Sequence, residues 1–191
     1  AAALLEVLRR PVPKWLTWTG IVSAFCVAAY TGFLLGVVSA YPLWNNAILP
    51  VLFVVSALSA GLAATSLVGL ITDRERFEQM WLIKKSHVIL SAIEMVVLAT
   101  MLIIVSSGSP EGAASVASLV SGQYAPMFWG GLVLLGLVAP FAIEGYPVFV
   151  TRKVETSTTS MVVSVIGEGG VLVGGFMLRL LVILAALPVL Y

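Results

Sequence analysis

Residues 48–71 read ILPVLFVVSALSAGLAATSLVGLI, a continuous apolar stretch without a charged side chain. A helix needs about 20 such residues to cross the ~30 Å hydrocarbon core of a bilayer. Four further stretches of this kind are present, so the sequence predicts five spans, at residues 15–40, 48–71, 80–106, 127–150 and 160–188. We expect helices, because unsatisfied backbone groups are costly in lipid and the alternating pattern of a membrane β-barrel is absent.

The overall composition supports a membrane protein. Of the 191 residues, 60% are hydrophobic and 10% are charged, whereas about 25% are charged in an ordinary soluble domain. A soluble protein of this size could not bury so much apolar surface in one core. The sequence therefore predicts an all-α integral membrane protein in which residues 1–191 form a single transmembrane helical domain.

The distribution of basic residues predicts the orientation of the five spans. All Lys and Arg residues except Arg179 fall on one side of the membrane: Arg9, Arg10, Lys14, Arg74, Arg76, Lys84, Lys85, Arg152 and Lys153. Loops rich in Lys and Arg remain in the cytoplasm. The basic loops are thus predicted to be cytoplasmic and the C-terminus to lie outside.

Four ionisable residues lie within the predicted spans: Glu94, Glu144, Glu168 and Arg179. Because such residues are costly in lipid, each is a candidate for a functional role. The carboxyl groups can relay protons, with Glu94 the first choice because it lies deepest, or they can fix helix packing through buried partners. Glu168 and Arg179 share a helix face but are separated by roughly 16 Å along the axis, too far for an ion pair.

Several kinds of site are excluded by residue counts. The single cysteine, Cys26, lies in an apolar stretch, and the single histidine, His87, lies at the cytoplasmic end of the third predicted span. These are too few ligands for a zinc site or for a membrane haem with paired histidines. We find no phosphate-binding loop, no hydrolase triad and no sign of nucleic-acid binding.

The connection between the first two spans combines Tyr30 with the turn Pro42-Leu43-Trp44-Asn45. A tyrosine hydroxyl at depth needs a polar partner, and the turn adds an indole and an amide at the outer surface. This arrangement would suit the head group of a membrane-soluble quinone. Taken alone, however, these residues favour an interfacial tyrosine above a capped turn.

Two GxxxG pairs, Gly32/Gly36 and Gly170/Gly174, predict close approach between helices. Small residues at this spacing allow helix backbones to pack tightly in membranes.

Several of these motifs together resemble the NrfD-like family, the membrane subunits of polysulfide reductase and of related respiratory complexes such as alternative complex III. The motifs, in sequence order, are Tyr30-Thr31-Gly32, Pro42-Leu43-Trp44-Asn45, the mid-helix Glu94, Phe128-Trp129-Gly130-Gly131, and Leu172-Val173-Gly174-Gly175-Phe176 followed by Arg179. The resemblance covers most of the sequence.

The resemblance implies a haem-free subunit that binds a quinone (menaquinone or ubiquinone) in the cytoplasmic (inner) membrane of a prokaryote. Its expected partners are a ferredoxin-like iron–sulfur subunit, on the outer side close to the quinone site, and a molybdopterin-type catalytic subunit connected to it. By the family pattern Tyr30 would contact the quinone head group, beside Trp44 and Asn45. Arg179 would stabilise a carboxylate or a reduced quinone.

Members of this family have eight or more spans, so the protein resembles the C-terminal part of a larger bundle. The residues Ala1–Leu8, which resemble the end of another helix, support this interpretation. The remaining helices would supply further quinone-site residues, including a histidine.

Two other functions fit parts of the sequence. The protein could be a structural membrane anchor without a working quinone site, because the glycine pairs and the turn would serve that role too. It could also be a secondary transporter or ion channel with Glu94, Glu144 and Glu168 along its path, although we find no inverted internal repeat.

Overall fold

The computed structural model describes residues 13–72, 81–146, 149 and 158–187. Its elements are α2 (Lys14–Gly36), α3 (Ile48–Thr72), α4 (Trp81–Gly108), α5 (Pro110–Val120), the π-helix η2 (Met127–Val138), α6 (Ala139–Tyr146) and α7 (Thr158–Leu184). Within the described ranges no residue lies in a β-strand. The predicted helix end at Ala1–Leu8 lies outside these ranges.

Five segments are long and apolar enough to cross a membrane, which confirms the prediction of a five-span helical protein. They are Lys14–Gly36, Ile48–Leu70, Leu82–Gly108, Met127–Tyr146 and Met161–Leu184. The first helix ends at Gly36, earlier than predicted, because the backbone turns from Val37 onward and Asn46 then caps the next helix. The Asn46 Oδ1 accepts hydrogen bonds from the backbone N–H groups of Ile48 and Leu49, at 3.0 and 2.9 Å.

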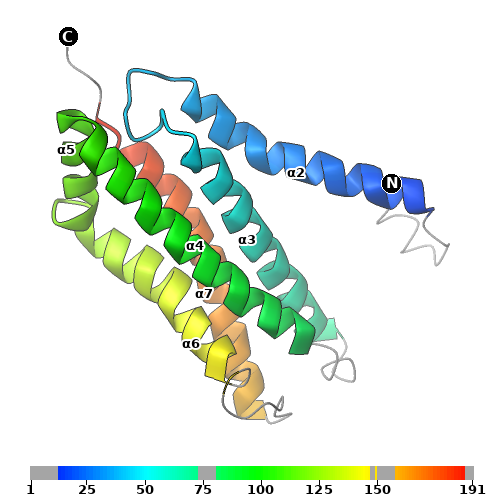
Figure 1. Ribbon diagram of the computed structural model, residues 1–191. Coiled ribbons are helices and arrows are strands. Elements are labelled where there is room, and N and C mark those ends of the chain that lie inside the picture. Colours follow the sequence, from blue (N-terminus) through cyan, green and yellow to red (C-terminus); the bar gives the residue numbers. More distant parts are fainter. Residues whose placement is uncertain (1–12, 73–80, 147–148, 150–157, 188–191) are drawn as a thin grey trace.

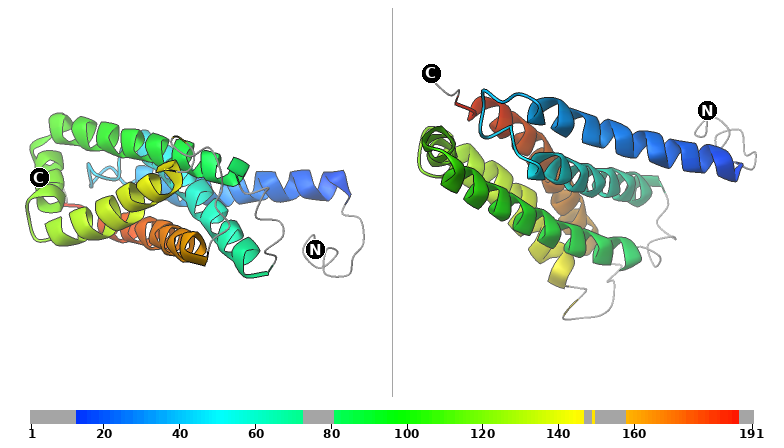
Figure 2. Two further views of the ribbon diagram at one scale, coloured as in Figure 1. Left: turned by 90° about the horizontal axis from the view of Figure 1, so that it is seen from below. Right: turned by 45° about the horizontal axis from the view of Figure 1, so that its top comes forward.

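Four of the spans form the bundle, and α2 lies at its side (Figure 1). α3 packs against α4 and α7, while the continuous segment of η2 and α6 packs against α4 and α7. α2 packs mainly against α3 and diverges from it toward its own N-terminal end, as Figure 1 and the left view of Figure 2 show. Most large apolar side chains of α2 are therefore exposed in this structure.

The bundle has two different ends. At the α5 end lie α5, the turn of residues 37–47 and the last residues of α7 (Figure 1). At the opposite end, which we call the basic end, α3 and α6 finish while α4 and α7 begin. In the sequence, the basic residues Arg74 and Arg76 follow α3, and Arg152 and Lys153 follow α6; all four lie outside the described ranges.

Glycines set the closest helix contacts. Gly136 of η2 and Gly174 of α7 touch so closely that a Cβ atom on either would collide with the backbone of the other. A Cβ atom on Gly170 would meet the carbonyl oxygen of Leu135, and one on Gly32 would meet Pro50 of α3. The predicted packing role is confirmed for these glycines of the two GxxxG pairs, whereas Gly36 makes only ordinary contacts.

The α5 helix closes one end of the bundle, within a connection for which the sequence predicted no span. Ser109 caps it by accepting a hydrogen bond from the Gly112 N–H at 3.0 Å, and Pro110 follows at its first position. The Ser115 hydroxyl then accepts a hydrogen bond from the Leu187 N–H at 3.1 Å. α5 is thus tied to the end of α7.

The interior of the bundle is divided by polarity. The apolar core occupies the half toward the α5 end; its fully buried members include Leu49, Leu52, Leu98, Met101, Leu132, Leu178 and Leu181. The half toward the basic end also has buried apolar side chains, such as Leu70 and Val88, but it holds most of the buried polar ones: Ser56, Ser59, Ser66, Lys84, His87, Ser91, Glu94, Glu144, Ser164 and Glu168. A functional site is expected in this polar half, because buried polar groups are costly and are seldom kept for packing alone.

Candidate functional site

A stripe of polar residues runs along one face of α4. Lys84, His87, Ser91 and Glu94 follow one another at alternating spacings of three and four residues, which places them on the same face of an α-helix. All four are buried in the bundle. The same face continues toward the α5 end with the buried apolar residues Leu98, Met101 and Val105. The polar stripe therefore begins at the basic end and stops at Glu94, near the middle of the helix.

Glu94 lies in a central cluster with Ser56, Ser59 and Arg179, between α3, α4 and α7. The carboxyl group of Glu94 is beside the hydroxyls of Ser56 and Ser59 and interacts electrostatically with Arg179. Arg179 donates a hydrogen bond from Nη1 to the carbonyl oxygen of Gly175 at 2.8 Å. Its guanidinium carbon also lies 5.6 Å from the centre of the Phe53 ring, a cation–π contact. Glu94 and Arg179 thus offset each other's charge at depth.

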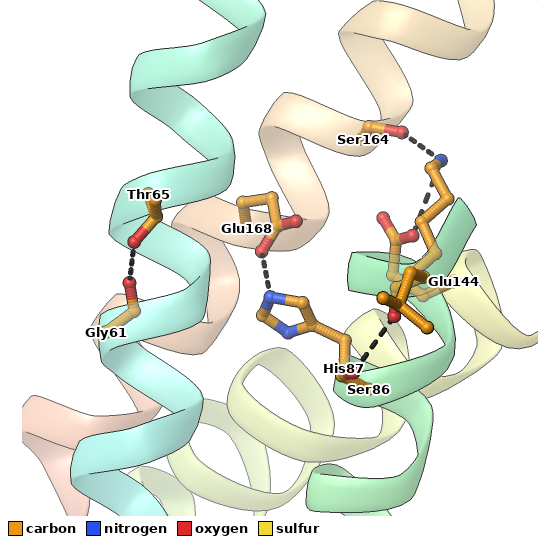
Figure 3. A network of polar contacts seen from close by, with 9 residues as sticks. Gly61, Thr65, Ser86, His87, Glu144, Ser164 and Glu168 are labelled. Atoms are coloured by element: carbon orange, nitrogen blue, oxygen red, sulfur yellow. Dashed lines mark hydrogen bonds and ion pairs between the residues drawn. The ribbon is translucent and has the colours of Figure 1, made fainter. Parts of the chain in front are cut away.

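A second group, the basic-end cluster, consists of Lys84, His87, Glu144, Ser164 and Glu168. Lys84 donates a hydrogen bond from Nζ to the Ser164 hydroxyl at 2.9 Å and lies 3.4 Å from Oε2 of Glu144. His87 extends from α4 toward α7, where its Nε2 lies 3.3 Å from Oε2 of Glu168 (Figure 3). Three helices, α4, α6 and α7, therefore bring the charged groups of this cluster together.

Several polar atoms in these clusters are buried without a hydrogen bond to another described residue. They are Oγ of Ser56 and Ser59, both ring nitrogens of His87, both carboxylate oxygens of Glu144, and Oε2 of Glu168. The His87–Glu168 and Lys84–Glu144 contacts are short but lack hydrogen-bond geometry. Buried polar groups in proteins are almost always satisfied by protein or water. The polar half of the bundle is therefore suited to hold water molecules and protons.

The residues predicted to bind quinone are dispersed at the α5 half of the molecule. Tyr30 lies on α2 with 61% of its surface exposed. Trp44 is half-buried and donates an indole hydrogen bond to the carbonyl oxygen of Val182 at 2.7 Å, while its ring lies 4.3 Å from that of Tyr41. Asn45 is exposed and lines a cleft of about 260 Å³ together with Asn46 and Ser109. Neither Tyr30 nor Trp44 lines this cleft.

An apolar groove of about 430 Å³ separates α2 from α3. The residues that line it are almost all apolar: Ile21, Ala24, Phe25, Ala28, Val54, Ala57, Leu58, Gly61, Leu62 and Thr65. Tyr30 is not among them. Sites of this size and lining are typical of apolar ligands, for which only a few polar groups fix the orientation.

Besides Ser164, two charged or titratable residues of the basic-end cluster were not predicted as site residues from the sequence. Lys84 was assigned to the cytoplasmic boundary and His87 to the edge of the membrane, yet His87 is 2% exposed and lies inside the bundle. The signal that could have found them is the helical spacing that they share with Ser91 and Glu94. In the described ranges, no three His, Cys, Asp or Glu side chains are arranged to hold a metal ion.

Comparison with known proteins gives a consistent family assignment. The sequence model of the family described as "Polysulphide reductase, NrfD" matches residues 1–190. Protein NrfD of Escherichia coli K12 is 30% identical over 182 residues, which cover 93% of this protein and 54% of the relative. A Protein NrfD homolog of Haemophilus influenzae is 28% identical over 166 residues, 86% of this protein and 50% of the relative.

A third relative is the C subunit of the polysulfide reductase of Wolinella succinogenes, which is 33% identical over 128 residues, 64% of this protein and 40% of the relative. The chain spans about half of the length of these curated relatives. No solved structure matches it.

Proposed function

The chain belongs to the polysulphide reductase NrfD family, and from this premise we propose that it acts as a haem-free, quinone-reactive membrane subunit of a respiratory oxidoreductase. The family match over residues 1–190, joined to five apolar helices, carries this proposal. The partners would be a ferredoxin-like iron–sulfur subunit, which exchanges electrons with the quinone, and a molybdopterin-type catalytic subunit. The name of one relative, a lettered subunit of polysulfide reductase, supports the existence of further subunits.

We place the quinone head group at the α5 half of α2, beside Tyr30. The Tyr30 hydroxyl is exposed and makes no hydrogen bond with another described residue, so it is available to a ligand. Trp44 and Asn45 would border the site from the turn between α2 and α3. The groove between these helices offers an apolar surface for the isoprenoid tail.

Replacing Tyr30 with Phe tests this site in the intact membrane complex. Tyr30→Phe removes one hydroxyl and is expected to lower quinone-dependent turnover at least tenfold, which corresponds to about 1.4 kcal/mol of lost stabilisation. The matched control is Tyr146→Phe, because Tyr146 is also 61% exposed but lies at the basic end of the bundle. Turnover is measured with a soluble quinol analogue at fixed complex concentration.

Unchanged turnover in Tyr30→Phe would contradict the site and favour a structural membrane anchor. One observation supports that second function: the Trp44 indole is already bonded to the end of α7, so the turn also fastens two helices together. If the protein is a structural membrane anchor, Trp44→Phe should lower the amount of assembled complex and leave the turnover per complex unchanged.

Quinone reduction also consumes two protons for every two electrons, and the buried carboxyl groups supply a route. We assign Glu94 as the deepest relay residue, with Glu144 and Glu168 between it and the basic end. Arg179 would hold Glu94 in place through their electrostatic interaction. The polar stripe of α4 supports this order, since buried polar side chains recur on this face from Lys84 to Glu94.

A further inference from the structure

The basic-end cluster carries more negative than positive charge. Lys84 offsets one of the two carboxylates, Glu144, which lies 3.4 Å from its Nζ atom. Glu168 faces His87 of α4 and the hydroxyl of Ser66 of α3, and it also interacts with Glu144 of α6. Ser164 of α7 and the Leu62 carbonyl near His87 add only neutral groups. Lys84 also acts electrostatically on Glu168, but its single positive charge cannot offset two carboxylates. Among the described residues, the cluster therefore carries one uncompensated negative charge unless His87 is protonated.

An uncompensated charge is unfavourable at this depth. Glu168 and Glu144 are both about 2% exposed or less, and two neighbouring buried carboxylates do not readily ionise together. One added proton makes the cluster neutral. His87 Nε2 and Glu168 Oε2 lie 3.3 Å apart, and either atom can accept this proton.

The same cluster contains buried polar atoms that water molecules could satisfy. Both ring nitrogens of His87, both oxygens of Glu144 and one oxygen of Glu168 lack hydrogen-bond partners among the described residues. Buried water molecules typically form about three hydrogen bonds each to such groups. Water in this position would connect Glu144, His87 and Glu168 without any movement of the helices.

Among the described residues, an apolar core separates the cluster from the α5 end. Toward the α5 end, the α4 stripe continues with Leu98, Met101 and Val105, which pack against Leu178 and Leu181 of α7 in the apolar core. Water is not expected in a core lined only by such side chains. Toward the basic end, Lys84 is the first member of the stripe and lies near the start of α4.

We propose that Lys84, His87, Glu144 and Glu168 form an internal site that binds water and one exchangeable proton, which is shared between His87 and Glu168 and exchanges through the basic end. This site extends the proton role of Glu144 and Glu168 proposed above. It does not require quinone chemistry, so a resting complex with no quinone turnover is the sample for its test.

Infrared difference spectroscopy of the purified complex tests the shared proton. Stepping the pH of wild-type protein is expected to produce a protonated-carboxyl C=O band that shifts in D2O, as a group in contact with water does. Glu168→Gln should abolish this band. His87→Gln should retain the band but move it to higher frequency, because the Glu168 carboxyl group loses the imidazole with which it shares the proton.

Glu94→Gln is the matched control, since Glu94 is also a buried carboxylic acid on the α4 stripe but belongs to the central cluster. The frequency shift caused by His87→Gln should persist in the Glu94→Gln background. If the complex does not assemble with Glu168→Gln, the band position in His87→Gln alone tests the shared proton.

Three results would overturn the proposal: a band that survives Glu168→Gln, a band that His87→Gln leaves unmoved, or a band that does not shift in D2O. None of them bears on Tyr30. The two proposals can therefore fail separately. Tyr30→Phe could lower quinone turnover and leave the band unchanged, or the band could behave as expected while Tyr30→Phe leaves turnover unchanged.

Discussion

Glu94 and Arg179 show how single charged residues are accommodated in the bundle. Each comes from a different helix, and each has neutral polar or aromatic neighbours in addition to the other charge: Ser56 and Ser59 for Glu94, Phe53 and the Gly175 carbonyl for Arg179. Removing one charge leaves the other at depth without compensation, which is costlier than removing both.

A double-mutant cycle measures this coupling. Glu94→Gln and Arg179→Met are each expected to lower the free energy of unfolding by about 1–3 kcal/mol, because the remaining group loses a charged partner. The double variant should lose less than the sum, with a coupling of at least ~0.5 kcal/mol. Unfolding is followed by SDS titration in mixed micelles.

The control cycle pairs Arg179→Met with Glu111→Gln, since Glu111 lies in the first turn of α5, away from the central cluster. These two effects should add within about 0.5 kcal/mol. Full additivity in the Glu94 cycle would show that Glu94 and Arg179 do not depend on each other.

The sequence predicted which ionisable residues are buried, but it did not predict the side chains that they contact. The cost of ionisable groups in lipid singled out Glu94, Glu144, Glu168 and Arg179, and all three carboxylates are buried. Their partners come from other helices, as with His87 for Glu168. Helical spacing could show that His87 shares a buried face with Glu94, but it could not show which carboxylate on another helix His87 faces. The assignment of Tyr30, Trp44 and Asn45 to a quinone remains a prediction.

At the scale of elements, the contact between η2 and α7 depends on two glycines. Gly136→Ala is expected to destabilise the protein by about 1–3 kcal/mol, because its methyl group would meet the Gly174 backbone and force the helices apart. Gly130→Ala is the matched control within the same helix, since no atom lies within 4 Å of the position its Cβ would take. Its effect should stay within about 0.5 kcal/mol.

Thermal unfolding of both variants in the same detergent distinguishes these outcomes. Equal unfolding temperatures for Gly136→Ala and Gly130→Ala would mean that the two helices can separate without loss, and that the close approach contributes nothing to stability.

The five spans were predictable because length and apolarity suffice to define a membrane helix. The π-helical geometry of η2 was not, since a helix that faces both lipid and core is apolar on every side and gives no periodic signal. α5 was missed for another reason: it is too short to span a bilayer. Its start does carry a recognisable signal, because Ser109 is an N-cap, Pro110 occupies the first position and Glu111 follows in the first turn.

For the whole molecule, the Lys and Arg residues of the loops predict the orientation in the membrane, and we expect the basic end to face the cytoplasm. Cysteine labelling in intact spheroplasts measures this. In a Cys26→Ser background, Gln123→Cys at the α5 end should react with a membrane-impermeant maleimide, while Tyr146→Cys should react only after lysis. Both positions are exposed. The opposite labelling pattern would reverse the proposed orientation.

The family assignment shows what an ordered set of weak motifs can achieve. No single motif was specific, but their order along the sequence led to the NrfD-like family, which the match over residues 1–190 confirms. The partners, the quinone and the direction of electron flow depend on chemistry beyond this protein, which spans about half of its curated relatives.

The division of the interior into a polar half and an apolar half also determines where a membrane voltage would act. With water in the polar half, that region would hold nearly one potential throughout, and the voltage drop would concentrate across the apolar half between Glu94 and the α5 end. Moving one elementary charge through the full drop is worth about 2.3 kcal/mol per 100 mV. A proton arriving at Glu94 from the basic end would cross little of that drop, whereas one passing on toward Tyr30 would cross most of it. The rate of the second step, and not of the first, would then respond to the proton-motive force.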